Sequence, residues 1–295
     1  MIRALIETLR PKQWTKNLLL FAGVLFSQQL DQPALVVRAA AGFVAFSLFA
    51  GCTYLFNDLH DAAADRQHPR KRLRPIASGR LPVPVAWGAL VPLLAVAIGL
   101  SLWLGHSFTL VAAAYVGQNL AYSLGLKDVV LIDVFIIALG FVLRAIAGVE
   151  LLRELSPGTA LSPWLLVCTF FGALFLALAK RRRELANAGD AAVDQRKVLE
   201  HYTPKLVDEL LLVSAATSVV GYALYTIWPS TVAKFGTEAL LYTVPFVAYG
   251  VFRYLYLLGA TENAEDPSLI LLSDRPMAGC VLCYLLVVLA ILYHA

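Results

Sequence analysis

The chain has 295 residues, of which 59% are hydrophobic and only 15% are charged, and its net charge at pH 7 is +4. A soluble domain carries about 25% charged residues because its surface must be hydrated. The composition therefore excludes an ordinary soluble protein and predicts a protein that faces lipid. We expect membrane lipids, and no nucleic acid, as its surroundings.

Apolar runs recur along the whole chain and are separated by polar clusters, which is typical of a multi-pass membrane protein. The first run, Leu18–Phe26, is short for a bilayer and is the least secure. No cleavage site follows it, so we interpret it as a retained helix. We expect an all-α membrane protein with nine transmembrane helices, at approximately residues 17–30, 35–56, 82–104, 108–124, 129–149, 162–179, 209–228, 238–257 and 277–294.

The basic residues are distributed unevenly between the loops. With a cytoplasmic N-terminus, the cytoplasmic segments hold most of the 24 Lys and Arg residues. Positive residues collect on the cytoplasmic side of membrane proteins, so we predict a cytoplasmic N-terminus and an external C-terminus. No linker or change of composition divides the chain. We therefore expect a single transmembrane domain over residues 1–295, in which loops 57–81 and 180–208 cap one site that opens to the cytoplasm.

Acidic side chains cluster directly after the second apolar run. Alanines and a leucine predict that its helix continues, which places Asn57, Asp61 and Asp65 on one face and Asp58 on a neighbouring face. Such acids repel one another and oppose the dipole of a helix end, and a bound cation removes both penalties. Oxygen ligands favour Mg²⁺, which completes its shell with water and phosphate oxygens. The pattern predicts a Mg²⁺–diphosphate site. The alternative is a solvated acidic helix end that neighbouring arginines neutralise.

Basic side chains follow in the loop Arg66–Arg80, and a second group, Lys180–Arg183 with Glu184, follows the sixth apolar run. Some of them serve only to orient the chain in the membrane. The others suit a substrate with more than one phosphate. We expect the site to include Lys16, Arg66, Arg72, Lys127, Lys180 and Arg181.

Arg144 lies inside the fifth apolar run, where a guanidinium is costly and marks a partner or a functional site. Asp133, in the same run, is its expected partner. A structural ion pair and a role in substrate binding both stay open.

The pattern Asn57-Asp58-x-x-Asp61-x-x-x-Asp65 resembles the first aspartate-rich motif of the UbiA superfamily of intramembrane prenyltransferases. Further blocks in chain order resemble one branch of it, the decaprenyl-phosphate phosphoribosyltransferases. The resemblance implies nine transmembrane helices, Mg²⁺, a diphosphate substrate, and a bacterial inner-membrane protein with a site that faces the cytoplasm. The blocks are Arg10–Asn17, Asp65–Ala77, Tyr122–Lys127, Gly140–Gly148, Lys180–Leu185, Leu199–Thr203, Arg253–Tyr254 and Asp274–Arg275.

The same resemblance implies transfer of a 5-phosphoribosyl group from phosphoribosyl diphosphate to a polyprenyl (decaprenyl) phosphate, with release of diphosphate. The product would serve the synthesis of the arabinose donor for arabinan in the cell envelope. As a hypothesis, Asn57, Asp61 and Asp65 bind the metal. The catalytic residues are Asp58, Asp61, Lys127 and Lys180, and the substrate-binding residues are Lys16, Arg66, Arg72, Arg144, Arg181, Glu184 and Tyr202, the last together with Glu184 on ribose hydroxyls.

One stretch departs from the superfamily pattern. Members that use prenyl diphosphates carry a second aspartate-rich motif after the sixth span, where this chain has Lys180–Glu184. Asp190 and Asp194 have a suitable spacing, but we interpret that pair as incidental. Bases in place of acids favour an additional phosphate over a second metal.

The alternative functions are a UbiA prenyltransferase that moves a prenyl group to an aromatic or other acceptor, and a membrane transporter. Charges on one membrane face speak against the transporter.

Overall fold

A computed structural model describes residues 1–69, 71–156, 159, 162–188, 197–260 and 274–294 of the chain. Every regular element within these ranges is a helix, so the prediction of an all-α protein is confirmed. The chain forms two compact units, Met1–Leu124 with Leu143–Ala160, and Gly125–Val142 with Leu161–Ala295. Helix α7 (Ile132–Arg153) begins in the second unit and ends in the first.

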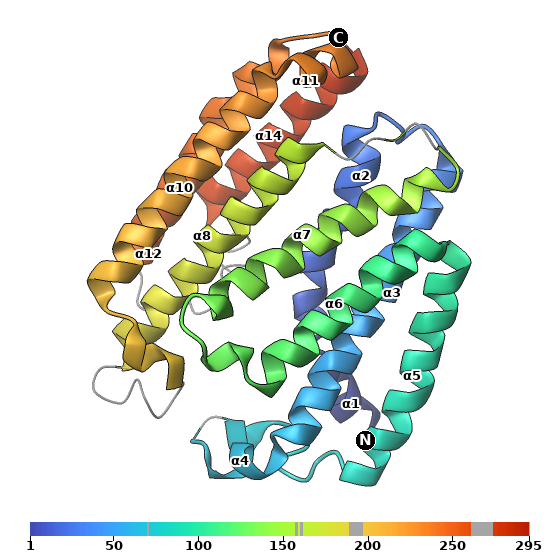
Figure 1. Ribbon diagram of the computed structural model, residues 1–295, viewed down its shortest axis with the longest axis vertical. Coiled ribbons are helices and arrows are strands. Elements are labelled where there is room, and N and C mark those ends of the chain that lie inside the picture. The colour runs from blue at the N-terminus through green and yellow to red at the C-terminus, as the bar shows by residue number, and fades with distance from the viewer. Residues whose placement is uncertain (70, 157–158, 160–161, 189–196, 261–273, 295) are drawn as a thin grey trace. The chain divides into compact units, whose positions relative to one another are not determined.

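The first unit is built around the long helix α3, which packs against α5 and α6. Its core includes a group of aromatic rings, in which the ring centre of Phe46 lies 5.6 Å from that of Phe108 and 5.2 Å from that of Tyr115. Figure 1 shows these elements in blue to green. They are α1 (Ile2–Leu9), the 3₁₀ helix η1 (Pro11–Leu20), α2 (Phe21–Phe26), α3 (Pro33–His60), α4 (Ala62–Gln67), the 3₁₀ helix η2 (Lys71–Leu73), α5 (Val83–Leu104) and α6 (His106–Leu124).

In the second unit, four long helices run side by side, with α8 against α10, α10 against α12, and α12 against α14 (Figure 1). Proline begins α8, α10 and α11, where its missing N–H costs nothing. The Thr203 hydroxyl caps α10 by accepting a hydrogen bond from the Leu206 N–H at 3.2 Å. The elements are η3 (Leu126–Asp128), α8 (Pro163–Ala188), η5 (Lys197–His201), α10 (Pro204–Ile227), α11 (Pro229–Phe235), η6 (Ala239–Thr243), α12 (Val244–Ala260) and α14 (Arg275–His294).

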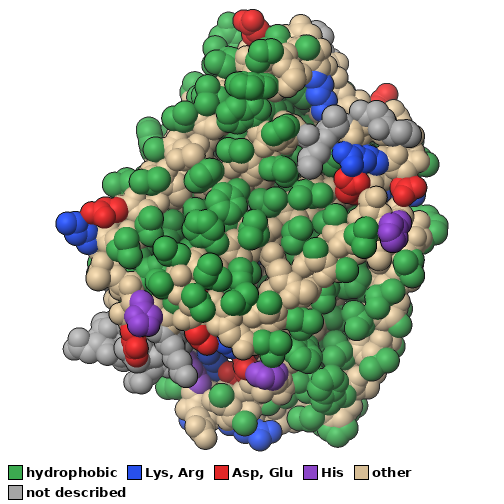
Figure 2. Space-filling model, in the orientation of Figure 1, with side chains coloured by type: hydrophobic (Ala, Val, Ile, Leu, Met, Phe, Trp, Pro, Cys, Tyr) green, Lys and Arg blue, Asp and Glu red, His purple; other side chains and the backbone are tan. Residues whose placement is uncertain are grey.

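Within the described residues, seven helices are long and apolar enough to cross a membrane. This agrees with an integral membrane protein. Figure 2 shows the corresponding surface: hydrophobic side chains cover most of the visible face, and charged side chains lie toward its margins. The seven segments are Pro33–His60, Val83–Leu104, Ile132–Arg153, Pro163–Ala186, Pro204–Ile227, Ala239–Ala260 and Arg275–Tyr293.

The first expected span, residues 17–30, is not one continuous helix. It consists of the end of η1 and the six-residue helix α2. Two glycines explain how this segment is held, because a Cβ on Gly23 would overlap the Gly148 backbone, and a Cβ on Gly148 would overlap the Leu20 backbone. The segment is therefore anchored by direct backbone contact with α7. The expected span 108–124 is present as α6, which is not among the seven most apolar helices.

Candidate active site

The acidic segment at the end of α3 is helical, with one interruption. α3 ends at His60, Asp61 follows, and α4 begins at Ala62. The Asp61 N–H donates to the Asn57 carbonyl and the Asp65 N–H donates to the Asp61 carbonyl, each at 2.9 Å. Hydrogen bonds of the helical type thus continue across the interruption, and the side-chain oxygens keep a spacing of about one turn.

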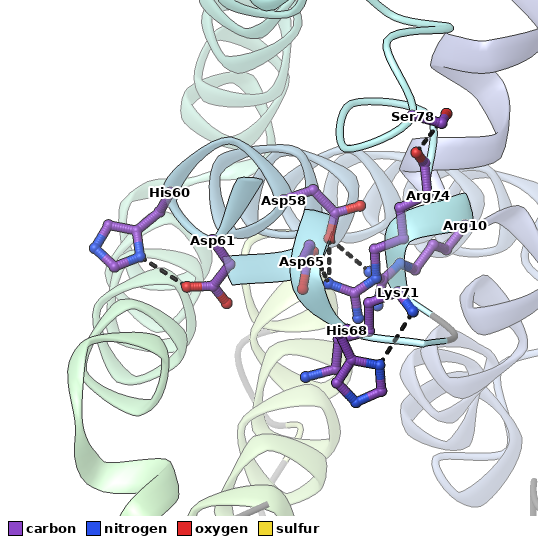
Figure 3. A network of polar contacts seen from close by, with 9 residues as sticks. All are labelled: Arg10, Asp58, His60, Asp61, Asp65, His68, Lys71, Arg74 and Ser78. Atoms are coloured by element: carbon purple, nitrogen blue, oxygen red, sulfur yellow. Dashed lines mark hydrogen bonds and ion pairs between the residues drawn. The ribbon is translucent and has the colours of Figure 1, made fainter. Parts of the chain in front are cut away.

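Two arginines hold the two most buried acids of this segment, Asp58 and Asp65, which are only 2% and 3% exposed. Arg74 Nη1 lies 3.2 Å from Asp58 Oδ1 and 2.7 Å from Asp65 Oδ2, so one guanidinium bridges both acids. Arg10 Nη2 donates to Asp58 Oδ1 at 2.8 Å. Figure 3 shows the two arginines converging on this pair. The acids lie about two turns apart and share the guanidinium of Arg74.

Asp61 points elsewhere. Its Oδ1 lies 2.9 Å from His60 Nδ1, and Figure 3 shows it turned toward His60, away from Arg10 and Arg74. We expected Asn57, Asp61 and Asp65 to act together along one face of the helix. In the structure, Arg74 instead joins Asp58 to Asp65, and Asp61 contacts His60. Among the residues that the structure describes, no three His, Cys, Asp or Glu side chains gather around a metal position.

Asn57 nevertheless fits a metal-binding role. Its Oδ1 is buried and has no hydrogen-bond partner among the described residues. A buried amide oxygen without a partner is costly, and a cation would satisfy it. Mg²⁺ takes one or two carboxylates and fills its shell with water and phosphate. Asn57 with Asp61, one turn further along, is compatible with such a sparse ligand set.

A cavity of about 320 Å³ lies beside the arginines, lined by Glu7, Thr8, Arg10, Asp58, Leu73, Arg74 and Pro75. Arg80 closes α1 onto the loop, because its two terminal nitrogens donate to the two carboxylate oxygens of Glu7, each at 2.9 Å. This hydrogen bond lowers the pKa of the Glu7 carboxyl. The cavity thus presents the guanidinium groups of Arg10 and Arg74 to an anion. Both arginines contact the acidic segment, whose carboxylates suit a cation.

Sequence reasoning selected other residues of this region. Arg66 and Arg72 are exposed, and Lys16 is half-buried in η1. Arg10 and Arg74, which contact the acids, were not selected, although both stand in the blocks that carry the family resemblance. The contact with Asp58 depends on a fold that brings Arg10 back to α3 from 48 residues away. No spacing along the chain indicates it.

Arg144 is buried in a neutral polar cluster of the first unit. Its Nε donates to Asn17 Oδ1 and its Nη2 donates to the Tyr115 hydroxyl, each at 2.8 Å. Asn17 in turn donates to Ser47 at 3.0 Å. The expected pair with Asp133 is wrong. The two residues are separated by about 16 Å along a continuous helix, which is too far for contact.

Asp133 instead forms the centre of a cluster in the second unit. Arg181 Nε donates to Asp133 Oδ2 at 2.7 Å, and Arg181 Nη1 donates to Glu184 Oε2 at 2.5 Å. The Tyr202 hydroxyl donates to Asp133 Oδ1 at 2.7 Å and accepts from the Leu131 N–H at 2.9 Å. Asp133 is 0% exposed and Arg181 is 1% exposed. Burial, together with the bond to Asp133, raises the pKa of Tyr202, which keeps this hydroxyl protonated.

This cluster brings together Arg181, Glu184 and Tyr202, three residues expected to bind substrate. Arg181 contacts Glu184 and Asp133, and Tyr202 contacts Asp133. Lys180 precedes Arg181 and is exposed, and Lys127 is half-buried in η3. Sequence reasoning missed the neighbouring pair Arg253–Asp274, whose oxygen and nitrogen atoms approach to 2.9 Å.

The hydrogen bond that Arg253 donates to Asp274 lowers the pKa of the Asp274 carboxyl below its ordinary value. Asp190 and Asp194 lie outside the described residues. The expected site residues thus fall into two groups, one in each unit.

Comparisons with known proteins extend these observations. A family described as the UbiA prenyltransferase family matches residues 18–273. The decaprenyl-phosphate phosphoribosyltransferase of Corynebacterium glutamicum is 34% identical over 98% of this chain and 86% of its own length. The enzyme of the same name from Mycolicibacterium smegmatis is 34% identical over 100% of this chain and 94% of its own. A solved UbiA homolog from Archaeoglobus fulgidus, bound to DMAPP and Mg²⁺, has the same fold, with a TM-score of 0.72, 19% identity and 98% of each chain covered.

Proposed function

The chain belongs to the UbiA prenyltransferase family, and from this premise we propose that it transfers a 5-phosphoribosyl group from phosphoribosyl diphosphate to a polyprenyl phosphate. The resemblance seen in the aspartate-rich motif is thereby confirmed, and the protein is a transferase. The observation that carries the proposal is the 34% identity, over nearly the whole chain, to enzymes named for this reaction. Use of the product for the arabinose donor of the cell envelope is part of the proposal.

The reaction replaces the diphosphate oxygen on C1 of the ribose by an oxygen of the lipid phosphate. The bond between C1 of the ribose and the diphosphate oxygen breaks, and its electron pair leaves with the diphosphate. An oxygen of the lipid phosphate forms the new bond to C1, which is electron-poor as the leaving group departs. A phosphate monoester is already anionic near neutral pH, so the attack needs no strong general base. The protein's task is to position two anions and to neutralise charge.

The acidic segment and its arginines suit this task. Mg²⁺, when bound, neutralises the charge that develops on the leaving diphosphate. Asn57 and Asp61 would hold it, and Asp65 would join them when Arg74 turns from the acids to the phosphates. Arg10 and Arg74 line the 320 Å³ cavity and are 31% and 26% exposed in their side chains, so both can exchange partners. The solved neighbours that bind Mg²⁺ support a divalent cation.

The second unit carries basic residues where other family members have a second aspartate-rich motif. Lys180 and Lys127 are our candidates for phosphate contacts, because a lysine acts as a point charge toward phosphate. Arg181 and Tyr202 would act as positioning residues through Asp133. Arg66, Arg72, Lys16 and Arg144 stay candidates for substrate binding, with Arg144 in its neutral cluster the most enclosed of them.

We also propose nine spans with a cytoplasmic N-terminus, an external C-terminus and a site facing the cytoplasm. The seven apolar helices, α6 and the η1–α2 segment would supply them. The distribution of Lys and Arg supports this orientation. A reporter enzyme fused to the C-terminus tests the count, because eight spans would keep it inside the cell.

The decisive experiment measures turnover of radiolabelled phosphoribosyl diphosphate with decaprenyl phosphate, with and without Mg²⁺. We expect Mg²⁺-dependent label in the lipid and one diphosphate released per transfer. A parallel reaction offers a prenyl diphosphate and an aromatic acceptor. Transfer only in the parallel reaction would identify an ordinary UbiA prenyltransferase and would overturn the proposal.

A further inference from the structure

The turn that joins η3 to α7 contains a strained residue. Leu131 has a φ of 67°, a left-handed conformation that costs free energy for any residue with a Cβ. Its side chain is 38% exposed, so packing of that side chain does not explain why the conformation persists. Strain of this kind persists only where the surrounding structure imposes it, and it gathers at functional sites. The turn is therefore held by a specific contact.

The Tyr202 hydroxyl supplies this contact. It accepts a hydrogen bond from the Leu131 N–H at 2.9 Å, across 71 residues of the chain. It also donates to Asp133 Oδ1 at 2.7 Å. A tyrosine hydroxyl has one proton, and because that proton is given to Asp133, the oxygen is left as an acceptor for the Leu131 N–H. The carboxylate thus fixes the direction in which the hydroxyl holds the turn.

The Tyr202 ring is fixed as firmly as its hydroxyl. The residue is only 3% exposed and lies in a small apolar cluster. Val130, the residue before Leu131, packs against the same cluster. The turn is therefore held twice from the same side, by a side chain and by a backbone N–H. The buried residues of the cluster are Val198, Leu199, Tyr202 and Val207.

Two candidate phosphate-binding lysines are attached to this network. Lys127 stands in η3, four residues before Leu131. Lys180 directly precedes Arg181, which donates to the other oxygen of Asp133, Oδ2, at 2.7 Å. All these residues belong to the second unit. A 3₁₀ helix as short as η3 does not hold its own position, so its placement depends on the turn that follows it.

We propose that Tyr202 is a positioning residue that acts through Leu131: it holds the turn in its left-handed conformation and so sets Lys127 against a phosphate of the donor. This inference deepens the proposed function and rests on it. A lysine meets phosphate as a point charge on a flexible stem, so the backbone that carries it must be held in place. Because Arg181 binds the same carboxylate, the network also keeps Lys127 at a fixed spacing from Lys180.

The first test is Tyr202→Phe, which keeps the buried ring and removes only the hydroxyl. We expect the KM for phosphoribosyl diphosphate to rise about tenfold, because a hydrogen bond to a charged phosphate is weakened. The KM for decaprenyl phosphate should stay within about twofold of the wild type. Either an unchanged KM for the donor or an equal rise for both substrates would overturn the proposal.

A second change in the same variant separates positioning from stability. Glycine adopts positive φ about as readily as negative φ, so Leu131→Gly removes the need for a contact that holds the turn. Added to Tyr202→Phe, it should bring the KM for the donor back to within about threefold of the wild type. Val129→Gly is the matched control, because Val129 lies in the same turn, is 45% exposed and has an extended backbone.

The control should leave the KM of Tyr202→Phe raised. Neither glycine restores the hydrogen bond to Asp133, so a loss that came only from a weakened core would not respond to Leu131→Gly. Failure of Leu131→Gly to lower the KM, or an equal recovery with Val129→Gly, would refute the positioning role.

Amide hydrogen exchange follows the turn itself and does not depend on turnover. Tyr202→Phe should speed exchange of the Leu131 amide about tenfold, because one hydrogen bond is lost. Peptides from α10 should exchange as in the wild type, which shows that the variant is folded. Unchanged exchange at Leu131 would overturn the proposal. Faster exchange in the variant, combined with no phosphoribosyl transfer by the wild type, would refute the proposed function and leave the hold on the turn standing.

Discussion

The two units each bring buried acids and arginines together, but they differ in how accessible the cations are. Around Asp133 in the second unit, Arg181 is 1% exposed and is held by carboxylates. Around Asp58 and Asp65 in the first unit, Arg10 and Arg74 keep 31% and 26% of their side chains exposed and line a cavity. The difference teaches that basic residues of the same family blocks can differ widely in their access to a ligand. Access to a ligand, and not charge, separates the two kinds of cluster.

The largest effect on stability is expected for Arg181→Met. It leaves the fully buried Asp133 without its cation, which costs about 3–5 kcal/mol. The matched control is Arg182→Met on the same helix, whose partner Asp208 is 48% exposed, and which should cost about 0–1 kcal/mol. Thermal unfolding in detergent checks both. Equal stability of the two variants would mean that the Asp133 cluster is not the structural one.

Arg74→Met should mainly reduce activity. Removing a positioned charge from a phosphate site costs about 2.7–4 kcal/mol, or a factor of about 100 to 1,000 in turnover. Arg72→Met, on the same loop but exposed, should cost less than tenfold, or about 1.4 kcal/mol. Arg74→Met also leaves the buried Asp65 without its cation, although Arg10 still contacts Asp58, so turnover is compared per folded molecule. A larger loss of turnover in Arg72→Met would reverse our assignment of the two arginines.

Asp61→Asn tests whether the acidic segment of the first unit binds a cation. The Mg²⁺ concentration for half-maximal turnover should rise at least tenfold, or about 1.4 kcal/mol, because a carboxylate ligand is lost. Asn57→Ala should show the same direction. Asp31→Asn, in an exposed loop, is the control and should leave the Mg²⁺ dependence unchanged. Unaltered turnover and Mg²⁺ dependence in Asp61→Asn would exclude a metal at this helix end.

The smallest effect is expected at Asp274, which Arg253 holds at a pKa below its ordinary value of 3.8. Since the pKa is lower in the folded state, the pair stabilises the protein above that ordinary value, and the contribution is lost as the pH falls through the folded pKa. Asp274→Asn should therefore melt slightly below the wild type at neutral pH, and the two should converge in strong acid. A constant difference across the pH range would contradict a charge effect.

The candidate site could be predicted in part. The acidic segment, the basic group after the sixth apolar run and the cluster members Arg181, Glu184 and Tyr202 stand in recognisable blocks of the sequence. Their partners do not. Asp133 pairs with Arg181, 48 residues away, and not with Arg144 in its own helix. Arg74 was passed over for Arg72, although only the former reaches Asp58 and Asp65.

The amino-acid sequence by itself determined that this protein is a bundle of lipid-facing helices and to which family it belongs. Length and hydropathy of a segment are local properties, and motif spacing survives without knowledge of the fold. Only the tertiary structure decided which charged side chains form buried ion pairs with one another and which line a cavity. Those pairings depend on how segments far apart in the chain pack, and a choice between neighbouring arginines is made by a few ångströms of backbone placement.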